Sequence, residues 1–409
     1  MKIMILSINY WPESTGIGAF TTYRAEYLAN HGHIVCVCTT FPYYPGWKVL
    51  EGYRGKLAIN EEHCKVKILR SYAYIPNPVK TIKRVLHEGS YVASSFLSAL
   101  LGGRPDLLLV VSPPLGLALS AIVLSKLWKI PFVFDVEDIQ PDSAGDLNML
   151  PKYIVNYLYK LERVAYMKAS MVTTLTSGMR NKILSKGISE DKVEIIEPRM
   201  DESLLSVGPQ DEMQFREKYG LKKKFIVVHS GNMGVKQGLD VVADAAMLSR
   251  FDDSIVYLLV GDGADRDRVF RRVIELKVSN VRFLPLLGEE DYRGLLSASG
   301  VCLVTQKRAV SEIAFPSKIV SYFSAGCPVI ASVNANSEVA RAVQESGAGF
   351  VVEAENGSAL HDAVMKIKIS NRNELSKMAR SYACRRWAAQ RVLGHMEKCL
   401  MRVAASSKR

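Results

Sequence analysis

The chain has 409 residues, of which 48% are hydrophobic and 23% charged, and its formal net charge is +12. One ordinary hydrophobic core rarely grows to this length, so we expect two domains in a soluble globular chain. The first apolar run is interrupted by Trp11-Pro12-Glu13 before it could act as a signal peptide, and a cytoplasmic protein is therefore expected.

The positive charge concentrates in two segments and suggests three classes of partner. Residues 48–84 hold nine Lys or Arg against three Glu, and a second basic stretch covers 385–409. Nucleic acid, anionic lipid and phosphorylated small molecules would each fit such charge. The sequence shows no zinc-finger or RRM signature, and its aromatic residues do not interleave with the charges, so nucleic acid is not expected as a partner.

A Gly-Ile-Gly loop at 16–18 separates the first predicted strand, at 3–8, from an amphipathic helix that ends at Gly32. Backbone N–H groups and the helix dipole at such a point can receive a phosphate. A dinucleotide-binding fingerprint would also need a glycine at position 21 and an acidic residue after the second strand. The chain has Thr21 and Thr39-Thr40 there, so an NAD or FAD enzyme is not expected, and a plain tight turn is an alternative.

The cysteines give no sign of a metal site. They are seven, an odd number, and they lack a ligand pair such as C-x-x-C. Cys36 and Cys38 alternate within the predicted strand 34–40 and should point to one face of the sheet. We therefore expect reduced thiols in the core and no bound metal.

Two segments bear on a membrane. Residues 77–102 mix lysine and arginine with apolar side chains, which fits an amphipathic helix on an anionic bilayer or a core helix with a basic outer face. Residues 107–125 carry no charge over a length that could cross a bilayer. Pro113-Pro114 and Gly116 interrupt this run, so we expect a buried strand followed by a helix.

Apolar strands alternate with helical patterns along the whole chain, which is typical of parallel sheets covered by helices. Strands are predicted at 3–8, 34–40, 66–72, 107–112, 132–136, 171–176 and 193–197, and in the second half at 225–231, 255–263, 281–286, 300–305, 328–333 and 349–353. This pattern predicts two Rossmann-like domains, 1–197 and 198–380, with a polar connector at 197–213. A helical tail, 381–409, is expected to pack back on the first domain.

Six motifs together resemble a known family. They are NYWPESTGIGAF, FPYYPGWKVLEGY, DVEDIQPDS, SGNMGVKQGLD, LLVGDGADRDRV and PSKIVSYFSAGCPVIA. Several put glycines where a strand's carboxyl end meets a helix, the side on which open α/β sheets bind ligands. Over nearly its whole length the chain resembles the retaining GT-B glycosyltransferases of family four. Within them it is most similar to bacterial O-antigen and colanic-acid transferases, among them L-N-acetylfucosamine transferases.

The resemblance implies an α/β fold of the GT-B type, with two Rossmann-like domains facing across a cleft. The first domain would bind the acceptor and the second the nucleotide sugar. The implied reaction transfers a sugar with retention from a nucleotide diphosphate sugar, UDP-linked and N-acetylated, such as UDP-L-FucNAc. The acceptor would be a polyprenyl-diphosphate-linked saccharide of O-antigen or capsule synthesis, at the cytoplasmic face of the inner membrane. No metal or other cofactor is implied.

The resemblance also assigns residues to the donor diphosphate. Gly16 and Gly18 would approach it with main chain, because a missing Cβ allows close contact. Lys318 would act as a catalytic cation at a helix start, with Ser317 capping that helix or bonding a phosphate oxygen. Alternatives are a helix-entry turn for the glycines and a solvated surface lysine for Lys318. The other implied donor contacts are Gly231, Asn232, Lys236, Gly261, Phe283 and Glu338.

Three donor positions depart from the family pattern. Asn232 stands where relatives carry Arg, and Gln237 stands where they carry Lys. Lys236, one residue before that position, would therefore take the place of the family lysine. The family has two glutamates seven residues apart, and the second binds the ribose. Here Ser321 occupies the position of the second glutamate, and Glu312 lies near the position of the first but does not match the family spacing. Glu338 could supply the missing carboxylate, although a solvated helix residue is an equal alternative.

The segment VFDVEDIQPD ends a predicted strand of the first domain and holds four carboxylates, Asp135, Glu137, Asp138 and Asp142. Grouped carboxylates raise one another's pKa unless cations or hydroxyl donors lie among them. Family members often have His-Asp at 137–138, and the chain has Glu-Asp there. Asp138 is our first candidate for orienting the acceptor hydroxyl and Glu137 the second; an acidic cluster at a helix start is the alternative.

The acceptor is expected to contact the segment around PYYPGW. Tyr43, Tyr44 and Trp47 form an aromatic-proline loop suited to a sugar face, and Glu13 is added as an acceptor contact. Two other functions share the architecture. A nucleotide-sugar 2-epimerase would need paired acids and a histidine, which we cannot place. A non-catalytic GT-B-like binding protein is favoured only by the incomplete glutamate pair.

Overall fold

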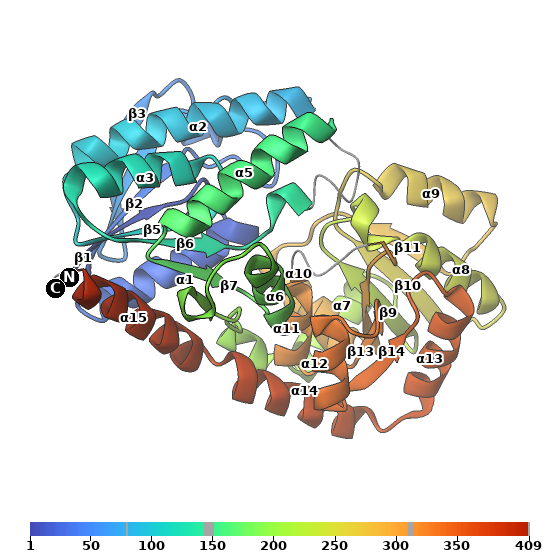
Figure 1. The fold of residues 1–409 in the computed structure, drawn as a ribbon. Coiled ribbons are helices and arrows are strands. Elements are labelled where there is room, and N and C mark those ends of the chain that lie inside the picture. Colours follow the sequence, from blue (N-terminus) through green and yellow to red (C-terminus); the bar gives the residue numbers. More distant parts are fainter. Residues whose placement is uncertain (79–80, 143–150, 310–314, 408–409) are drawn as a thin grey trace. The chain divides into compact units, whose positions relative to one another are not determined.

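The computed structural model describes residues 1–78, 81–142, 151–309 and 315–407 and divides into two compact units (Figure 1). The first comprises Met1–Glu197 and Val392–Arg409, and the second comprises Pro198–Arg391. The predicted tail 381–409 is thus shared between them. Its first part belongs to a helix, Arg372–Trp387, whose Tyr382 and Trp387 are buried in the second core, and only the part from Val392 joins the first unit.

The first unit contains an eight-stranded sheet in the order β3-β4-β2-β1-β5-β6-β7-β8. Its strands are β1 (Lys2–Leu6), β2 (Ile34–Thr40), β3 (Ala58–His63), β4 (Val66–Ser71), β5 (Leu107–Ser112), β6 (Phe132–Val136), β7 (Met171–Thr174) and β8 (Val193–Ile195). All pairings are parallel except β3 with β4. The central strands are buried on both faces, which explains why they read as unbroken apolar runs.

The antiparallel β3–β4 hairpin was not among the predicted elements. Cys64 and Lys65 form its two-residue turn with φ of 48° and 65°, as a type I′ hairpin requires. Along β3, exposed and half-buried residues alternate, because this edge strand covers no core. Its sequence AINEEH therefore lacks the apolar run by which the buried strands are recognised.

Helices cover both faces of this sheet: α1 (Gly16–Asn30), α2 (Thr81–Gly102), α3 (Leu117–Trp128), α5 (Lys152–Lys168), α6 (Ser177–Ser185) and α15 (Ala389–Ser406), with short 3-10 turns at Glu51–Tyr53 and Glu190–Lys192 (Figure 1). Ion pairs fasten α15 to this unit. His33 Nε2 lies 2.8 Å from Glu397 Oε1, and Arg402 pairs with Glu194. Among the described residues no helix is long and apolar enough to cross a bilayer, and 107–125 form strand β5 and most of helix α3, as predicted.

The second unit contains a six-stranded parallel sheet in the order β11-β10-β9-β12-β13-β14. Its strands are β9 (Phe225–Ser230), β10 (Ile255–Val260), β11 (Val281–Leu284), β12 (Val301–Thr305), β13 (Val329–Ser332) and β14 (Gly349–Val352). Its helices are α7 (Pro209–Lys218), α8 (Asp240–Leu248), α9 (Arg266–Glu275), α10 (Glu289–Ala298), α11 (Lys318–Ser324), α12 (Glu338–Ser346), α13 (Gly357–Ile369) and α14 (Arg372–Trp387), with 3-10 turns at Glu202–Ser206 and Val235–Gln237.

Both sheets reverse their strand order beside the first strand of the unit. In the first, β1 lies between β2 and β5; in the second, β9 lies between β10 and β12. Ligands of open α/β sheets bind at such switch points, outside the carboxyl ends of the strands. The loops that follow β1 and β9 are therefore the places to look for a site in each unit.

Candidate functional site

The loop after β9 packs main chain against the loop after β10. Gly231 has φ of +104° and Gly261 has φ of +125°, both in the region that favours glycine. A Cβ on Gly261 would lie only 2.1 Å from the Gly231 carbonyl oxygen. The structure thus brings together two of the predicted donor residues, and it shows that close packing of two loops requires glycine at Gly261.

Lys318 is the first residue of α11 and reaches this same loop. Its Nζ lies 3.4 Å from His229 Nε2, and a Cβ on Gly231 would lie 3.9 Å from it. Lys318 is half-buried, and its partial removal from solvent lowers its pKa to about 7. Burial, and then the charge of Lys318, hold the pKa of His229 well below its ordinary value. His229 is therefore neutral and accepts a hydrogen bond from the lysine ammonium.

A second contact fixes α11 on β9. The Tyr322 hydroxyl, on α11, lies 3.0 Å from both the backbone nitrogen and the hydroxyl of Ser230, the last residue of β9. Tyr322 and His229 are fully buried. Sequence reasoning did not single out either residue, because both look like ordinary core positions of a strand and a helix. Together they determine where the Lys318 ammonium is held.

The remaining residues of the glycine-rich loop differ in their roles. Asn232 is exposed, and Lys236 is half-buried in the turn Val235–Gln237. Gln237 Oε1 accepts a hydrogen bond of 3.0 Å from the Gly234 backbone, and the Lys236 carbonyl accepts one of 2.9 Å from Lys307. The Gln237 side chain thus closes the loop on itself.

Three other predicted donor residues lie at separate places in the second unit. Ser317 is exposed at the N-cap of α11, but its side chain makes no capping hydrogen bond in the described residues, so the capping alternative was wrong. Phe283 lies on edge strand β11, with Phe270 edge-on at 5.3 Å between ring centroids. Glu338 begins α12 and pairs with Arg341 at 3.1 Å. Glu312 lies outside the described residues.

In the first unit the acidic cluster after β6 contains its own cation. Arg24 Nη1, from α1, lies 2.5 Å from both Asp135 Oδ2 and Glu137 Oε1, and the Thr173 hydroxyl donates to Asp135 at 2.6 Å. Burial and the charge of Asp135 raise the pKa of Glu137 to about 7 in spite of Arg24. The cation and hydroxyl donor that grouped carboxylates need are both present, so Glu137 has a structural role in a buried ion pair.

The other two carboxylates of that segment lie nearer the surface. Asp142 is paired with Lys182 at 3.3 Å and with Lys186 at 2.5 Å. Asp138 is half-buried, unlike Glu137. The position of Asp138 is compatible with its predicted contact to an acceptor hydroxyl, which stays a prediction.

Glu13 joins the loop after β1 to the aromatic loop. Its Oε1 accepts hydrogen bonds from the backbone nitrogens of Tyr43, at 2.8 Å, and Tyr44, at 2.7 Å. Its Oε2 accepts one of 2.8 Å from Asn9 Nδ2. A Cβ on Gly18 would lie 2.9 Å from Glu13 Cβ, so glycine is needed for this contact. Glu13 is buried and therefore positions the aromatic loop.

The three aromatic residues of that loop are unequally exposed. Tyr43 is buried, with its hydroxyl 2.9 Å from Nε2 of His87 and its ring 5.4 Å from that of Trp47. Tyr44 is 38% exposed and Trp47 is half-buried. Tyr43 therefore packs in the interior and supports the loop, whereas the rings of Tyr44 and Trp47 are accessible to a sugar. Gly16, with φ of +60°, lies beside the Tyr44 ring.

Comparison with known proteins agrees with this architecture. Residues 15–199 match a family described as "Glycosyl transferase 4-like domain", and residues 211–386 match "Glycosyl transferases group 1". The chain is 31% identical over 403 residues to the "Putative colanic acid biosynthesis glycosyl transferase WcaI" of Escherichia coli (strain K12), covering 96% of this chain and 98% of that protein. The chain belongs to the group 1 glycosyltransferase family. It is therefore a glycosyltransferase.

This glycosyltransferase has further relatives. It is 23% identical over 309 residues to the "Probable glycosyltransferase WbjE" of Pseudomonas aeruginosa, covering 75% of each chain. Its fold matches Anabaena Alr3699/HepE in complex with UDP, with a TM-score of 0.73, 17% identity and coverage of 98% and 100% of the two chains. It also matches the sucrose-phosphate synthase of Thermosynechococcus elongatus, with a TM-score of 0.78, 16% identity and coverage of 99% of each chain. The predicted GT-B fold is confirmed.

Proposed function

We propose that this glycosyltransferase moves a sugar, with retention, from a UDP-linked donor to a lipid-linked saccharide. The observation that carries the proposal is the Lys318 ammonium at the switch point of the second sheet, beside the Gly231 loop. A nucleoside diphosphate is the leaving group, and its charge grows as the glycosidic bond breaks. A cation held in a low-dielectric site stabilises that charge most strongly in the transition state.

The depressed pKa of Lys318 fits this role. Without an anion, burial makes the charged form costly, and the pKa falls to about 7. A bound diphosphate would favour the charged form again and raise the pKa. Neutral His229 accepts one hydrogen bond from the Lys318 ammonium, with Nε2 3.4 Å from Nζ, and so leaves the other N–H groups of the ammonium to face the ligand. Main-chain N–H groups of the glycine loop would add hydrogen bonds to the phosphate oxygens.

The transfer itself balances without a separate base. The bond between the anomeric carbon and the phosphate oxygen breaks, and the acceptor hydroxyl forms a bond to the same face of that carbon. The hydroxyl proton passes to the departing phosphate. Asp138 would orient the acceptor hydroxyl, and Lys318, Lys236 and Ser317 would hold the diphosphate. In this scheme the charges are handled by the chain's own side chains, so we propose a metal-independent reaction.

Names of relatives support the finer assignments. The Alr3699/HepE structures contain UDP and UDP-glucose, which supports a UDP donor. The E. coli relative is described as a colanic acid biosynthesis enzyme, which supports surface polysaccharide as the product. The sequence resemblance alone supports the remaining parts of the proposal, an N-acetylated deoxysugar such as UDP-L-FucNAc as donor and a polyprenyl-diphosphate saccharide as acceptor.

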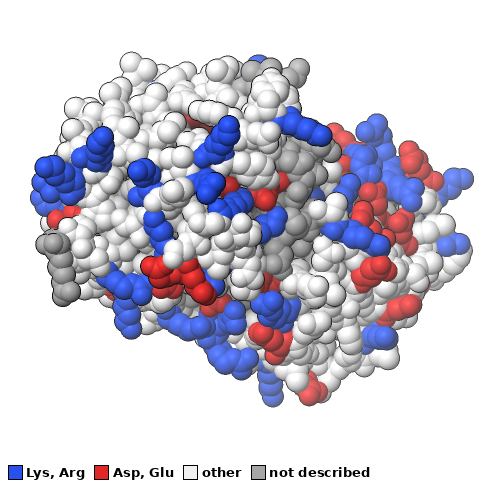
Figure 2. All heavy atoms as spheres, viewed as in Figure 1, with Lys and Arg blue, Asp and Glu red and all other residues white. Residues whose placement is uncertain are grey.

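A lipid-linked acceptor would require access to a membrane surface, and the first unit has a suitable face. Neighbouring helices α2, α3 and α5 expose large apolar side chains: Val85, Leu86, Leu97, Leu100, Leu101, Leu119, Val123, Leu127, Tyr153, Tyr157, Val164 and Met167. Most of the surface over α2 is uncharged in Figure 2, whereas acidic and basic side chains gather over α8 and α9. We propose that this apolar helix face binds the cytoplasmic side of the inner membrane.

The function is tested by release of free nucleotide. Purified enzyme is incubated with UDP-, GDP- and dTDP-sugars and an acceptor extract, and the nucleotide diphosphate released is measured. We expect UDP release with an N-acetylated donor, lowered about 100-fold or more by Lys318→Ala. Lys222→Ala, an exposed lysine of the same unit, should leave the rate unchanged. A loss below about tenfold for Lys318→Ala, less than about 1.4 kcal/mol, would remove Lys318 as the main diphosphate contact.

A further inference from the structure

Among the described residues, the first unit holds two groups of potential metal ligands that include none of the predicted site residues. In each, a glutamate, a histidine and a cysteine bring one ligand atom within 4.8 Å of the other two. The groups are Glu26, His63 and Cys64, and Glu194, His395 and Cys399. The sequence did not predict either, because the members come together only when helices pack beside strands.

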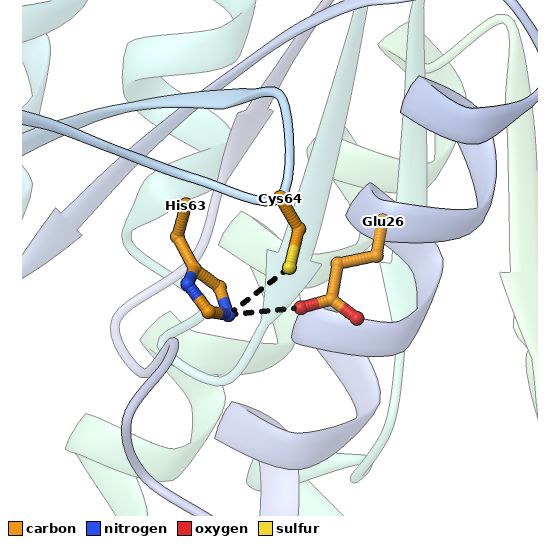
Figure 3. A group of neighbouring side chains, drawn as sticks. All are labelled: Glu26, His63 and Cys64. Atoms are coloured by element: carbon orange, nitrogen blue, oxygen red, sulfur yellow. Dashed lines mark hydrogen bonds and ion pairs between the residues drawn. The ribbon is translucent and has the colours of Figure 1, made fainter.

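In the first group, three side chains converge from two elements (Figure 3). His63 ends β3 and Cys64 begins the hairpin turn, whereas Glu26 lies on α1. His63 Nε2 lies 3.3 Å from Glu26 Oε1 and 3.4 Å from Cys64 Sγ. Figure 3 shows that both contacts meet at the same ring nitrogen.

This convergence does not suit a proton relay. A neutral imidazole nitrogen carries either one proton or one lone pair, so Nε2 cannot serve both a carboxylate and a thiol well. A nucleophilic triad uses the two ring nitrogens separately, one for the nucleophile and one for the acid. A cation placed among the three atoms would satisfy all of them.

The spacing of the ligand atoms fits a tetrahedral ion. Zinc bonds of about 2.0 Å to nitrogen and oxygen and about 2.3 Å to sulfur place ligand N and O about 3.3 Å apart, and N and S about 3.5 Å apart. The corresponding distances at His63 are 3.3 Å to Glu26 and 3.4 Å to Cys64. The ligand atoms of Glu26 and Cys64 lie within 4.8 Å of each other, so any further closure on the ion would be needed along that edge.

A neighbouring aromatic residue fixes the orientation of the histidine ligand. The Trp11 ring stacks on His63 with centroids 4.0 Å apart and an interplanar angle of 14°, which holds the imidazole plane in place.

The second group is already occupied by a cation. Arg402 Nη2 lies 2.5 Å from Glu194 Oε1 and 3.9 Å from Cys399 Sγ. A guanidinium in this place repels a metal ion and takes the carboxylate from it. In contrast, within the described part of the chain the ion-pair partner of Glu26 is His63.

We propose that Glu26, His63 and Cys64 bind a divalent ion of the zinc class, which fastens the β3–β4 hairpin to α1. Thiolate, imidazole and carboxylate together select zinc or a similar transition ion over magnesium or calcium. With three protein ligands, the fourth position is left for water. All three ligands belong to the first unit, and the proposal does not depend on the proposed transfer reaction.

Cobalt(II) is the probe that tests the site, because a cobalt–thiolate bond gives a charge-transfer absorption in the near ultraviolet. Untagged full-length protein is titrated with Co²⁺ and then with Zn²⁺, and Trp fluorescence and the melting temperature are followed in parallel. The variants are Cys64→Ser and Glu26→Gln. Cys384→Ser is the matched control, since Cys64 and Cys384 are the two exposed cysteines of the chain.

We expect one equivalent of Co²⁺ to produce the thiolate band, Zn²⁺ to displace it, and Zn²⁺ to raise the melting temperature. Cys64→Ser should abolish the band, Glu26→Gln should weaken binding about tenfold or more, and Cys384→Ser should bind as the unaltered chain does. The proposal is overturned if the unaltered chain gives no band, or if Cys64→Ser keeps it. Loss of the band in Cys384→Ser would overturn it equally, by placing the thiolate elsewhere.

Discussion

Lys318 Nζ and His229 Nε2 lie 3.4 Å apart, and the two groups cannot both be protonated at neutral pH. The pKa of Lys318 is lowered to about 7, and that of His229 lies well below its ordinary value. Near neutrality the pair therefore carries at most one positive charge. In the free enzyme Lys318 is protonated in only part of the molecules, and a bound anion increases that fraction.

Donor binding should take up a proton. At pH 8 the free enzyme holds Lys318 mainly neutral, because its pKa is about 7, whereas a bound diphosphate would raise that pKa. Calorimetry of UDP binding at pH 8, in buffers of different ionisation enthalpy, should show uptake approaching one proton. Uptake should be lost in Lys318→Met. UDP binding with no proton uptake would show that the diphosphate is held elsewhere.

The same pKa shift predicts how affinity depends on pH. Free Lys318 loses its charge as pH rises through about 7, so UDP should bind more weakly with each unit above that value. Between pH 7 and the ordinary lysine pKa of 10.5, the folded chain also binds fewer protons than the unfolded chain, so its stability should rise with pH over that interval.

Removing the Arg24 cation should destabilise the first unit. Arg24→Met leaves the buried Asp135 and Glu137 carboxylates without compensation, and the free energy of unfolding should fall by about 3–5 kcal/mol. The measurement is denaturant unfolding of the full chain. Arg84→Met, at a partly exposed pair with Glu88, should cost no more than about 0.5 kcal/mol.

A double variant separates the ion pair from simple packing. Arg24→Met combined with Glu137→Gln removes one buried charge of each sign, and it should recover a substantial part of the stability lost in Arg24→Met alone. If the two substitutions add without recovery, the destabilisation comes from lost packing of the arginine and not from uncompensated charge.

Gly261→Ala should disrupt the contact between the loops after β9 and β10. The new Cβ would lie 2.1 Å from the Gly231 carbonyl oxygen, and φ is +125°, so both the space and the backbone oppose it. We expect a loss of at least about 2 kcal/mol in unfolding free energy and weaker UDP binding. At Gly288, where nothing lies within 4 Å of an added Cβ, alanine should cost about 1 kcal/mol or less.

The apolar helix face can be tested with vesicles that contain phosphatidylglycerol. Leu101, on α2, is 88% exposed, and Leu101→Glu should reduce vesicle binding about fivefold or more by placing a charge on the face. Ile369→Glu, at an equally exposed apolar residue of the second unit (85%), should leave binding unchanged. Binding that depends on anionic lipid should also fall with added salt. Equal binding by both variants would exclude this face.

Much of the fold could be predicted because buried parallel strands must be apolar throughout. The strands at 107–112 and 132–136 coincide with β5 and β6, whereas 171–176 and 225–231 each extend past the end of the observed strand. The edge strand β3 was missed because solvent covers it and its sequence is polar. The expectation of core thiols was wrong for Cys64 and Cys384, which are exposed.

The site was less predictable because its contacts join distant parts of the chain. Grouped carboxylates predict a nearby cation but do not say which one. Arg24 lies 111 positions from Asp135 in the sequence, so only the folded structure identifies it as that cation. His229 likewise lies 89 positions from Lys318. Local patterns could identify glycine loops and a lysine at a helix start, but not the groups that set their protonation.

The chain passes between the two units twice, after Glu197 and again after Arg391. In topological terms the second unit is an uninterrupted insertion, while the first is assembled from both ends of the sequence. A gene fragment for 198–391 therefore contains every strand of its sheet and is a reasonable candidate for separate expression. Deletion of α15, in contrast, would remove Glu397, the ion-pair partner of His33. A deletion at the C-terminal end of the chain would therefore destabilise the unit that begins at the N-terminal end.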